Sequence, residues 1–137
     1  MLEKEVIQVR GFHNIMEDGA VTGYQFRVRL ESYRGQWLCM MRFDGVEVDG
    51  QKIANDDMVW CIGGVDYTID QMADISKVQW PISEAAVVKV KKAGGLAQGY
   101  HDFVVAYRHI AAYIPPMMDD SPMSRERGRF TRKLLLV

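Results

Sequence analysis

Alternation of apolar and polar side chains is the clearest pattern in the chain. Between residues 24 and 31 every second side chain is apolar and the intervening ones are polar or charged: Tyr24, Phe26, Val28 and Leu30 against Gln25, Arg27, Arg29 and Glu31. Successive side chains of a strand point to opposite faces of a sheet. The pattern therefore predicts a strand with one buried and one solvated face.

Further short segments carry strand patterns, and turn residues separate many of them. We expect strands at Val6–Val9, Trp37–Phe43, Val46–Val48, Gln51–Ile53, Met58–Ile62, Asp66–Thr68, Ala86–Lys91, Tyr100–Ile114 and Phe130–Val137. The Asp49-Gly50 dipeptide favours a type I′ turn, which predicts a hairpin between the third and fourth of these segments. Gly63-Gly64 and Gly94-Gly95 are typical of turns.

Only one helix start is evident. Thr68 followed by Gln71 fits a capping box, so we expect a short helix over about residues 69–73. Eight to ten short strands with one helical turn predict an all-β chain, an antiparallel β-sandwich of jelly-roll-like type. Without repeats or low-complexity linkers, residues 1–137 are expected to form a single β-sandwich domain.

Composition narrows the class of protein. The chain has 137 residues, 48% of them apolar and 26% charged, with a net charge of -1. This balance disfavours a dedicated nucleic-acid-binding protein. No apolar run approaches membrane-spanning length, and the first residues do not resemble a signal peptide. We therefore expect a cytoplasmic protein that binds neither nucleic acid nor membrane, with Cys39 and Cys61 reduced.

The residue types of a catalytic centre are sparse. His101 and His109 lie in one extended segment, so about 26 Å would separate them and they could not share a metal ion. Cys39 and Cys61 have apolar neighbours and are expected to be small core residues. The sequence contains no phosphate-binding loop and no nucleophile elbow. No catalytic set can be assigned, although His101 stands out beside a turn.

One loop has an unusual composition. Residues 115–123 contain three prolines and three methionines. Proline has no backbone N–H to donate to the hydrogen bonds between strands, and methionine is an adaptable contact residue. The loop could fold back over the edge of the sandwich, or it could be a contact arm for a partner or a ligand. The basic stretch that follows, from Arg125 to Lys133, could meet an acidic partner or form a solvated strand face.

Several of these segments together resemble a known family. They are Phe43-Asp44-Gly45-Val46-Glu47-Val48, Gly64-Val65-Asp66-Tyr67-Thr68-Ile69-Asp70-Gln71-Met72, Trp80, Gly94-Gly95-Leu96-Ala97-Gln98-Gly99-Tyr100-His101 and Tyr113-Ile114-Pro115-Pro116. In this order they resemble the small β subunit of bacterial C-glycoside deglycosidases, over about residues 5–137. No single segment is diagnostic, but their combination is fairly specific.

The resemblance implies a division of labour between two subunits. The partner would be a larger α subunit similar to sugar-isomerase TIM barrels, carrying a divalent metal, commonly manganese, and the acid–base residues. The substrate would be a flavonoid or phenolic C-glucoside already oxidised to its 3-oxo form, cleaved by elimination as in a lyase. This chain would contain no catalytic residue and no metal, and would be inactive alone. Its candidate contacts with the partner or the substrate pocket are Tyr113, Pro115, Pro116, Met117, Met118, Met123 and His101.

Two other functions remain open at this point. A carbohydrate-binding β-sandwich without catalysis could stack sugars on exposed aromatic side chains, with Trp37, Trp60, Trp80 and Tyr100 as candidates, unless these rings are core. A stand-alone enzyme could use His101 together with a carboxylate.

Overall fold

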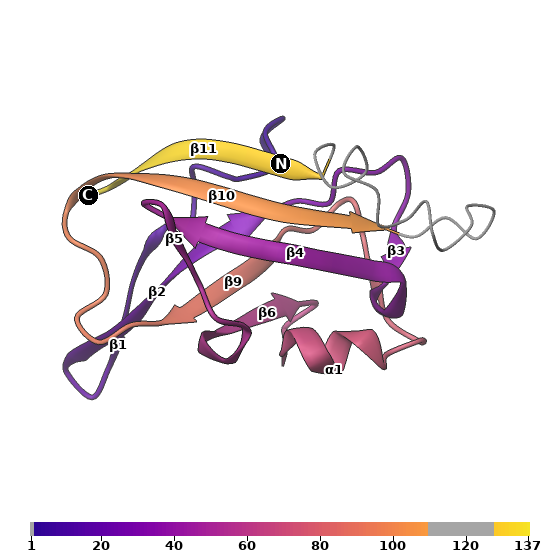
Figure 1. Cartoon of the computed structure of the whole chain (residues 1–137), viewed down its shortest axis with the longest axis horizontal. Helices are drawn as coiled ribbons and strands as arrows, with labels where there is room; N and C mark the ends of the chain where they lie inside the picture. The colour runs from indigo at the N-terminus through magenta and orange to yellow at the C-terminus, as the bar shows by residue number, and fades with distance from the viewer. Residues whose placement is uncertain (1, 110–127) are drawn as a thin grey trace.

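The computed structural model describes residues 2–109 and 128–137 (Figure 1). Its largest sheet has five strands. In spatial order they are β1 (His13–Glu17), β2 (Ala20–Val28), β9 (Ala86–Lys91), β6 (Met58–Ile62) and β7 (Val65–Tyr67). All neighbouring pairs are antiparallel. The alternation at residues 24–28 lies on β2, where Tyr24, Phe26 and Val28 are buried, as the pattern predicted.

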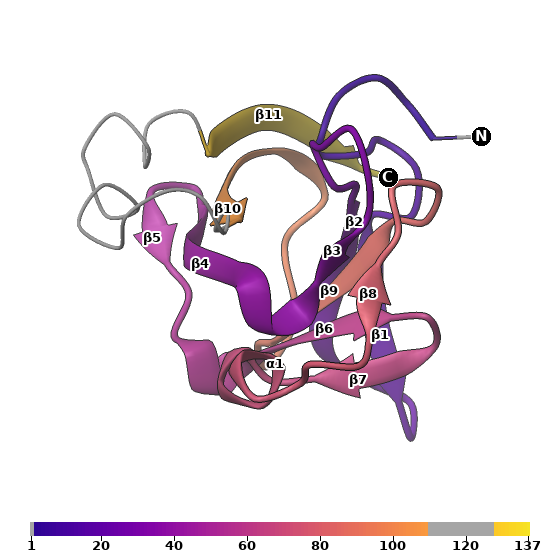
Figure 2. The ribbon, with the colours of Figure 1, turned by 90° about the vertical axis from the view of Figure 1, so that its right-hand side faces the viewer.

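A second sheet of four strands faces the first. Its order is β11 (Arg129–Leu136), β10 (Gly99–His109), β4 (Met41–Val48) and β5 (Gln51–Lys52), again antiparallel. The predicted hairpin is confirmed, because Val48 pairs with Gln51, and Asp49 and Gly50 both have positive φ. Seen end-on in Figure 2, this sheet curves over the five-stranded one.

Smaller elements close one side of the molecule. Strands β3 (Gln36–Trp37) and β8 (Gln79–Trp80) form a two-stranded sheet. Two 3-10 helices, η1 (Leu38–Met40) and η2 (Asn55–Asp57), precede β4 and β6. Helix α1 (Ile69–Ala73) begins at Thr68 with both hydrogen bonds of the capping box, so the predicted helix is confirmed. Met72 of this helix is buried in the core.

Aromatic side chains link the sheets through the core. Trp60 of β6 packs on Phe43 of β4 with ring centroids 4.7 Å apart, and on Trp80 at 5.8 Å. Trp80 in turn packs on Tyr107 of β10 at 5.3 Å. Because aromatic rings bury large areas, this chain of contacts is a major source of packing between the layers. The fold is therefore an antiparallel β-sandwich with one short helix, which confirms the predicted fold class.

Three expectations about local structure need correction. The predicted strand at 37–43 is wrong in its middle, because residues 38–40 form η1. The backbone N–H groups of Leu38 and Cys39 bond to the carbonyl oxygens of Val78 and Ile75 after α1, so the chain leaves the strand ladder there. The segment at 6–9 forms only one isolated bridge, between Ile7 and Val28. Strands β1, β3 and β8 were not predicted; β3 and β8 have only two residues each.

Candidate functional site

His101, the one predicted contact residue within the described part of the chain, lies in β10 and bonds to a carboxylate. Its ring Nδ1 is 2.6 Å from Oδ2 of Asp49, which lies in the turn between β4 and β5. Its Nε2 is 2.7 Å from the carbonyl oxygen of Ala97. Asp49 also accepts a hydrogen bond from the backbone N–H of Asp102 at 2.9 Å. We call His101 and Asp49 the histidine clasp, since they join a turn, a strand and a loop.

The charge state of the clasp follows from its hydrogen bonds. Burial disfavours the charged ring, but the hydrogen bonds to Ala97 and Asp49 outweigh it, so the pKa of His101 is raised above its ordinary value. Burial likewise disfavours the carboxylate, and the bonds from His101 and Asp102 outweigh it, so the pKa of Asp49 is lowered. Both partners of the ring are acceptors, which a doubly protonated ring satisfies by donating twice. A ring in that state has no free nitrogen to act as a general base.

The loop that carries Ala97 is itself fixed by Asn14 of β1. The Asn14 amide donates from Nδ2 to the carbonyl oxygen of Leu96 at 3.0 Å, and its Oδ1 accepts from the Leu96 N–H at 2.9 Å. Gly95 has a φ of +62°, and a Cβ there would lie 2.4 Å from the Asn14 Oδ1. The double glycine therefore permits both the turn and this close approach.

A cavity of about 290 Å³ lies beside the clasp, between the ends of the two larger sheets. Tyr24, Asp49 and Leu96 contribute to its lining. Burial raises the pKa of the Tyr24 phenol to about 12, with a further contribution from the negative charge of Asp49. Its hydroxyl bonds to no other described residue. The cavity thus combines apolar side chains with a phenol, two carboxylates and three lysines, and its volume is just below the range of drug-sized ligand sites.

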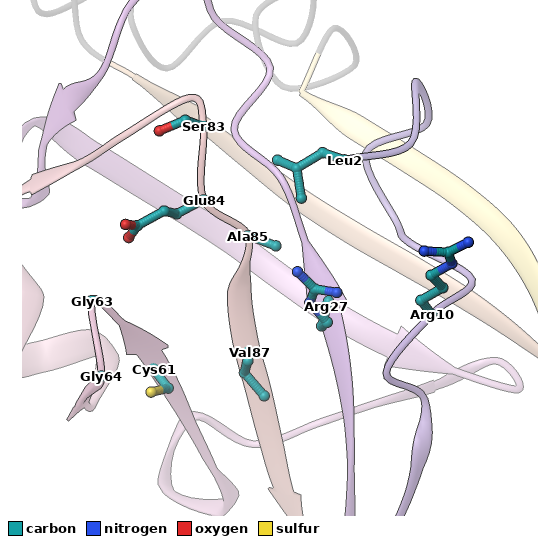
Figure 3. A pocket seen from close by; sticks show the side chains of 10 residues that line it. All are labelled: Leu2, Arg10, Arg27, Cys61, Gly63, Gly64, Ser83, Glu84, Ala85 and Val87. Atoms are coloured by element: carbon teal, nitrogen blue, oxygen red, sulfur yellow. The ribbon is translucent and has the colours of Figure 1, made fainter.

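A larger hollow, of about 660 Å³, lies on the outer face of the five-stranded sheet (Figure 3). Its lining residues are Leu2, Arg10, Arg27, Cys61, Gly63, Gly64, Ser83, Glu84, Ala85 and Val87. In Figure 3 the side chains of Arg10 and Arg27 lie near one another on one side, with Glu84 on the opposite side. We call this feature the outer hollow.

The four aromatic candidates for sugar stacking divide into two groups. Trp60 and Trp80 are core residues, with 1% and 0% of their surface exposed, so they cannot stack on a ligand. Trp37 and Tyr100 are exposed, but they lie on different sheets. The sandwich therefore does not assemble these four rings into one platform for a sugar.

The remaining candidate residues have simple placements. Tyr113, Pro115, Pro116, Met117, Met118 and Met123 lie outside the described residues. Cys39 and Cys61 are free thiols that are only partly buried, not fully buried core residues as expected. Burial and the neighbouring Asp66 raise the pKa of the Cys61 thiol, which lowers its reactivity.

Two further properties concern only residues 2–109 and 128–137. This part of the chain contains no group of three or more His, Cys, Asp or Glu side chains placed to hold a metal ion. None of its helices is long and apolar enough to cross a membrane.

Comparison with known proteins identifies the family. The family model described as "C-glycoside deglycosidase beta subunit" matches residues 2–113. A protein of Eubacterium cellulosolvens with the same description is 45% identical over 120 residues, which cover 87% of this chain and 82% of that protein. The chain belongs to the C-glycoside deglycosidase beta subunit family. This confirms the resemblance inferred from the motifs.

Family membership adds an expectation about the surface of this chain. A beta subunit works with a partner subunit, so a surface for that partner is expected in addition to any ligand site. Sequence reasoning picked out His101 but neither Asp49 as its partner nor the outer hollow. The alternation around Arg27 did place this side chain on the outer face of its strand, which was the one available signal.

Proposed function

We propose that this chain is the small subunit of an enzyme that cleaves the carbon–carbon glycosidic bond of 3-oxo-C-glucosides with flavonoid or phenolic aglycones. The observation that carries the proposal is the 45% identity to a protein described as a C-glycoside deglycosidase beta subunit. The partner would be a TIM-barrel-like α subunit that holds the acid–base residues. The reaction would be an elimination, and the enzyme a lyase.

The chemistry proposed for the complex follows from the 3-oxo group. The ketone acidifies the neighbouring C2 proton, and a base of the α subunit removes it. The aryl carbon then departs with the electron pair of the broken bond, assisted by the phenol beside it, and takes up a proton. A divalent metal in the α subunit, manganese by the family resemblance, would stabilise the negative charge of the enolate. We assign no proton transfer to this chain.

The contribution of this chain is proposed to be contact with the α subunit and its pocket. Tyr113, Pro115, Pro116, Met117, Met118 and Met123 remain the proposed contacts, on the strength of the proline- and methionine-rich composition of their segment. His101 remains a weaker candidate, since the histidine clasp already occupies both of its ring nitrogens. Its proposed role is to position the loop at 95–99.

Reconstitution tests the proposal. We expect a 3-oxo-C-glucoside to be cleaved when both subunits are mixed, and not by this chain alone. Cleavage by the purified chain at the rate of the complex would contradict the supporting role. Cleavage by the α subunit alone at that same rate would show that this chain is dispensable. Product analysis by liquid chromatography distinguishes these outcomes.

A further inference from the structure

The central strands of the five-stranded sheet have apolar residues on both faces. In β6 the side chains of Met58, Trp60 and Ile62 are buried, while Val59 and Cys61 alternate with them and point to the outer face. In β9 the same is true of Val87, between the buried Ala86 and Val88. The outward positions of β9 also include Lys89 and Lys91, so the apolar part of this face consists of Val59, Cys61 and Val87. The described residues cover only the inner face, since the outer hollow opens above Cys61 and Val87.

Two arginines beside this face have no ion-pair partner among the described residues. Arg10 and Arg27 line the outer hollow, and neither forms an ion pair within residues 2–109 and 128–137. Arg27 is half-buried. The aliphatic part of its side chain lies so close to Gly11 that a Cβ there would be 2.4 Å from its Cδ. The packing fixes the stem of Arg27 against the sheet, which reduces the entropy lost when its guanidinium binds a carboxylate.

On the five-stranded sheet Lys89 pairs with Asp66 at 3.1 Å, but the outer face of the four-stranded sheet carries more such pairs. Its charged side chains pair with one another across strands: Arg129 with Glu47 at 3.2 Å, Arg108 with Asp44 at 3.0 Å and Lys133 with Asp102 at 3.7 Å. Charges that are already paired gain little from a new partner. The five-stranded sheet therefore offers Arg10 and Arg27 to a partner, whereas Arg108 and Arg129 on the other face are already paired.

We propose that the outer face of the five-stranded sheet, centred on Val59, Cys61 and Val87 with Arg10 and Arg27 at its edge, is the docking surface for the α subunit. The partner surface would present apolar side chains to the centre and a carboxylate to the two arginines. This inference rests on the proposed function, because it locates the contact that the two-subunit enzyme requires.

The size of the face agrees with this role. Five strands at about 4.8 Å spacing and about six residues at 3.3 Å each give a face of roughly 20 by 20 Å, or about 400 Å². A specific interface buries about 800 Å² on each partner. The sheet face would supply about half, and flanking segments would supply the rest. Ser83–Ala85, which line the outer hollow, are candidates for part of that second half.

A pair of matched substitutions tests the surface. Val87 and Val104 are both half-buried and both point outward from a central strand, Val87 on the five-stranded sheet and Val104 on the four-stranded one. We expect Val87→Asp to lower the amount of cognate α subunit that co-purifies with this chain at least tenfold. Val104→Asp should leave that amount unchanged. Arg27→Glu should lower it as well. Thermal unfolding of each isolated variant, followed by circular dichroism, verifies that it folds.

Each outcome decides between the alternatives. If the unaltered chain forms no complex with the α subunit, the proposed function fails, and this inference with it. If the unaltered chain and Val87→Asp bind equally well, only the inference is overturned. Loss of binding with Val104→Asp alone would place the interface on the other sheet. Light scattering of the isolated chain tests whether a second copy of the chain occupies this face instead. A dimer that Val87→Asp dissociates would also overturn the proposal.

Discussion

The hydroxyl of Tyr107 donates a hydrogen bond to the backbone carbonyl oxygen of Arg29 at 2.7 Å, across 78 residues of sequence. The hydroxyl oxygen of Tyr107 in turn accepts a hydrogen bond from the backbone N–H of Glu31, also at 2.7 Å. Tyr107 belongs to β10, and Arg29 follows β2, so one buried phenol joins the two larger sheets. Burial raises the pKa of this phenol, which keeps it protonated and able to donate.

Replacing Tyr107 by Phe should destabilise the fold by about 1–3 kcal/mol, because the carbonyl of Arg29 and the N–H of Glu31 would lose their partner. Urea unfolding measures the change. Tyr33→Phe is the control, since the Tyr33 side chain is 81% exposed and has no such role. Equal unfolding free energies for the two variants would show that the bridge contributes nothing.

The histidine clasp should make stability depend on pH in a defined direction. The raised pKa of His101 means that its contribution is complete below the ordinary value of 6.5 and is lost as the pH rises through the raised value. The lowered pKa of Asp49 means that its contribution is complete above 3.8 and is lost as the pH falls through the lowered value. We expect His101→Gln to cost more stability at about pH 5.5 than at about pH 8.5.

His109 provides a control, because its effect on stability should depend on pH in the opposite direction. Burial, with a smaller effect of Arg34, lowers the pKa of His109, so the folded state binds this proton less readily than the unfolded chain does. His109→Gln should therefore cost less at about pH 5.5 than at about pH 8.5. Denaturant midpoints at both values test the pair. The same pH trend in both variants would contradict the stabilising role of protonated His101 in the histidine clasp.

The double glycine allows a comparison of adjacent positions. Gly94 and Gly95 both have positive φ, so alanine is strained at either, by about 1–2 kcal/mol. Only at Gly95 would the new methyl group meet neighbours, Val21 and Asn14, and the two bonds of Asn14 to Leu96 would be disturbed. Gly95→Ala should cost about 1–3 kcal/mol more than Gly94→Ala. Equal unfolding temperatures would show that the loop can move aside.

The methionines of the predicted contact loop can be tested without changing its length. Met117→Ser together with Met118→Ser should weaken binding to the α subunit at least tenfold, which is about 1.4 kcal/mol. Leucine at both positions keeps the apolar surface and should preserve most of the affinity. Calorimetric titration with the α subunit measures both variants. If serine and leucine behave alike, the methionine side chains are not part of the contact.

The sequence predicted the features that depend on neighbouring residues. The alternation at 24–30, the Asp49-Gly50 turn and the Thr68–Gln71 cap are local patterns, and each was confirmed. The 3-10 helix at 38–40 escaped prediction because long-range hydrogen bonds to Ile75 and Val78 determine it. The His101–Asp49 pair escaped it for the same reason, since 52 residues separate the two.

Strands β10 and β11 pair from Gly99 with Leu136 to Ala106 with Arg129, so His109 and Gly128, where the described residues stop and resume, lie at one end of the sheet. The two anchor points are fixed by the ladder, whatever the length of the connection between them. Each doubling of a connecting segment costs only about 0.6 kcal/mol in closure entropy. A segment of different length could therefore be grafted between these two anchor points at little entropic cost to the sandwich.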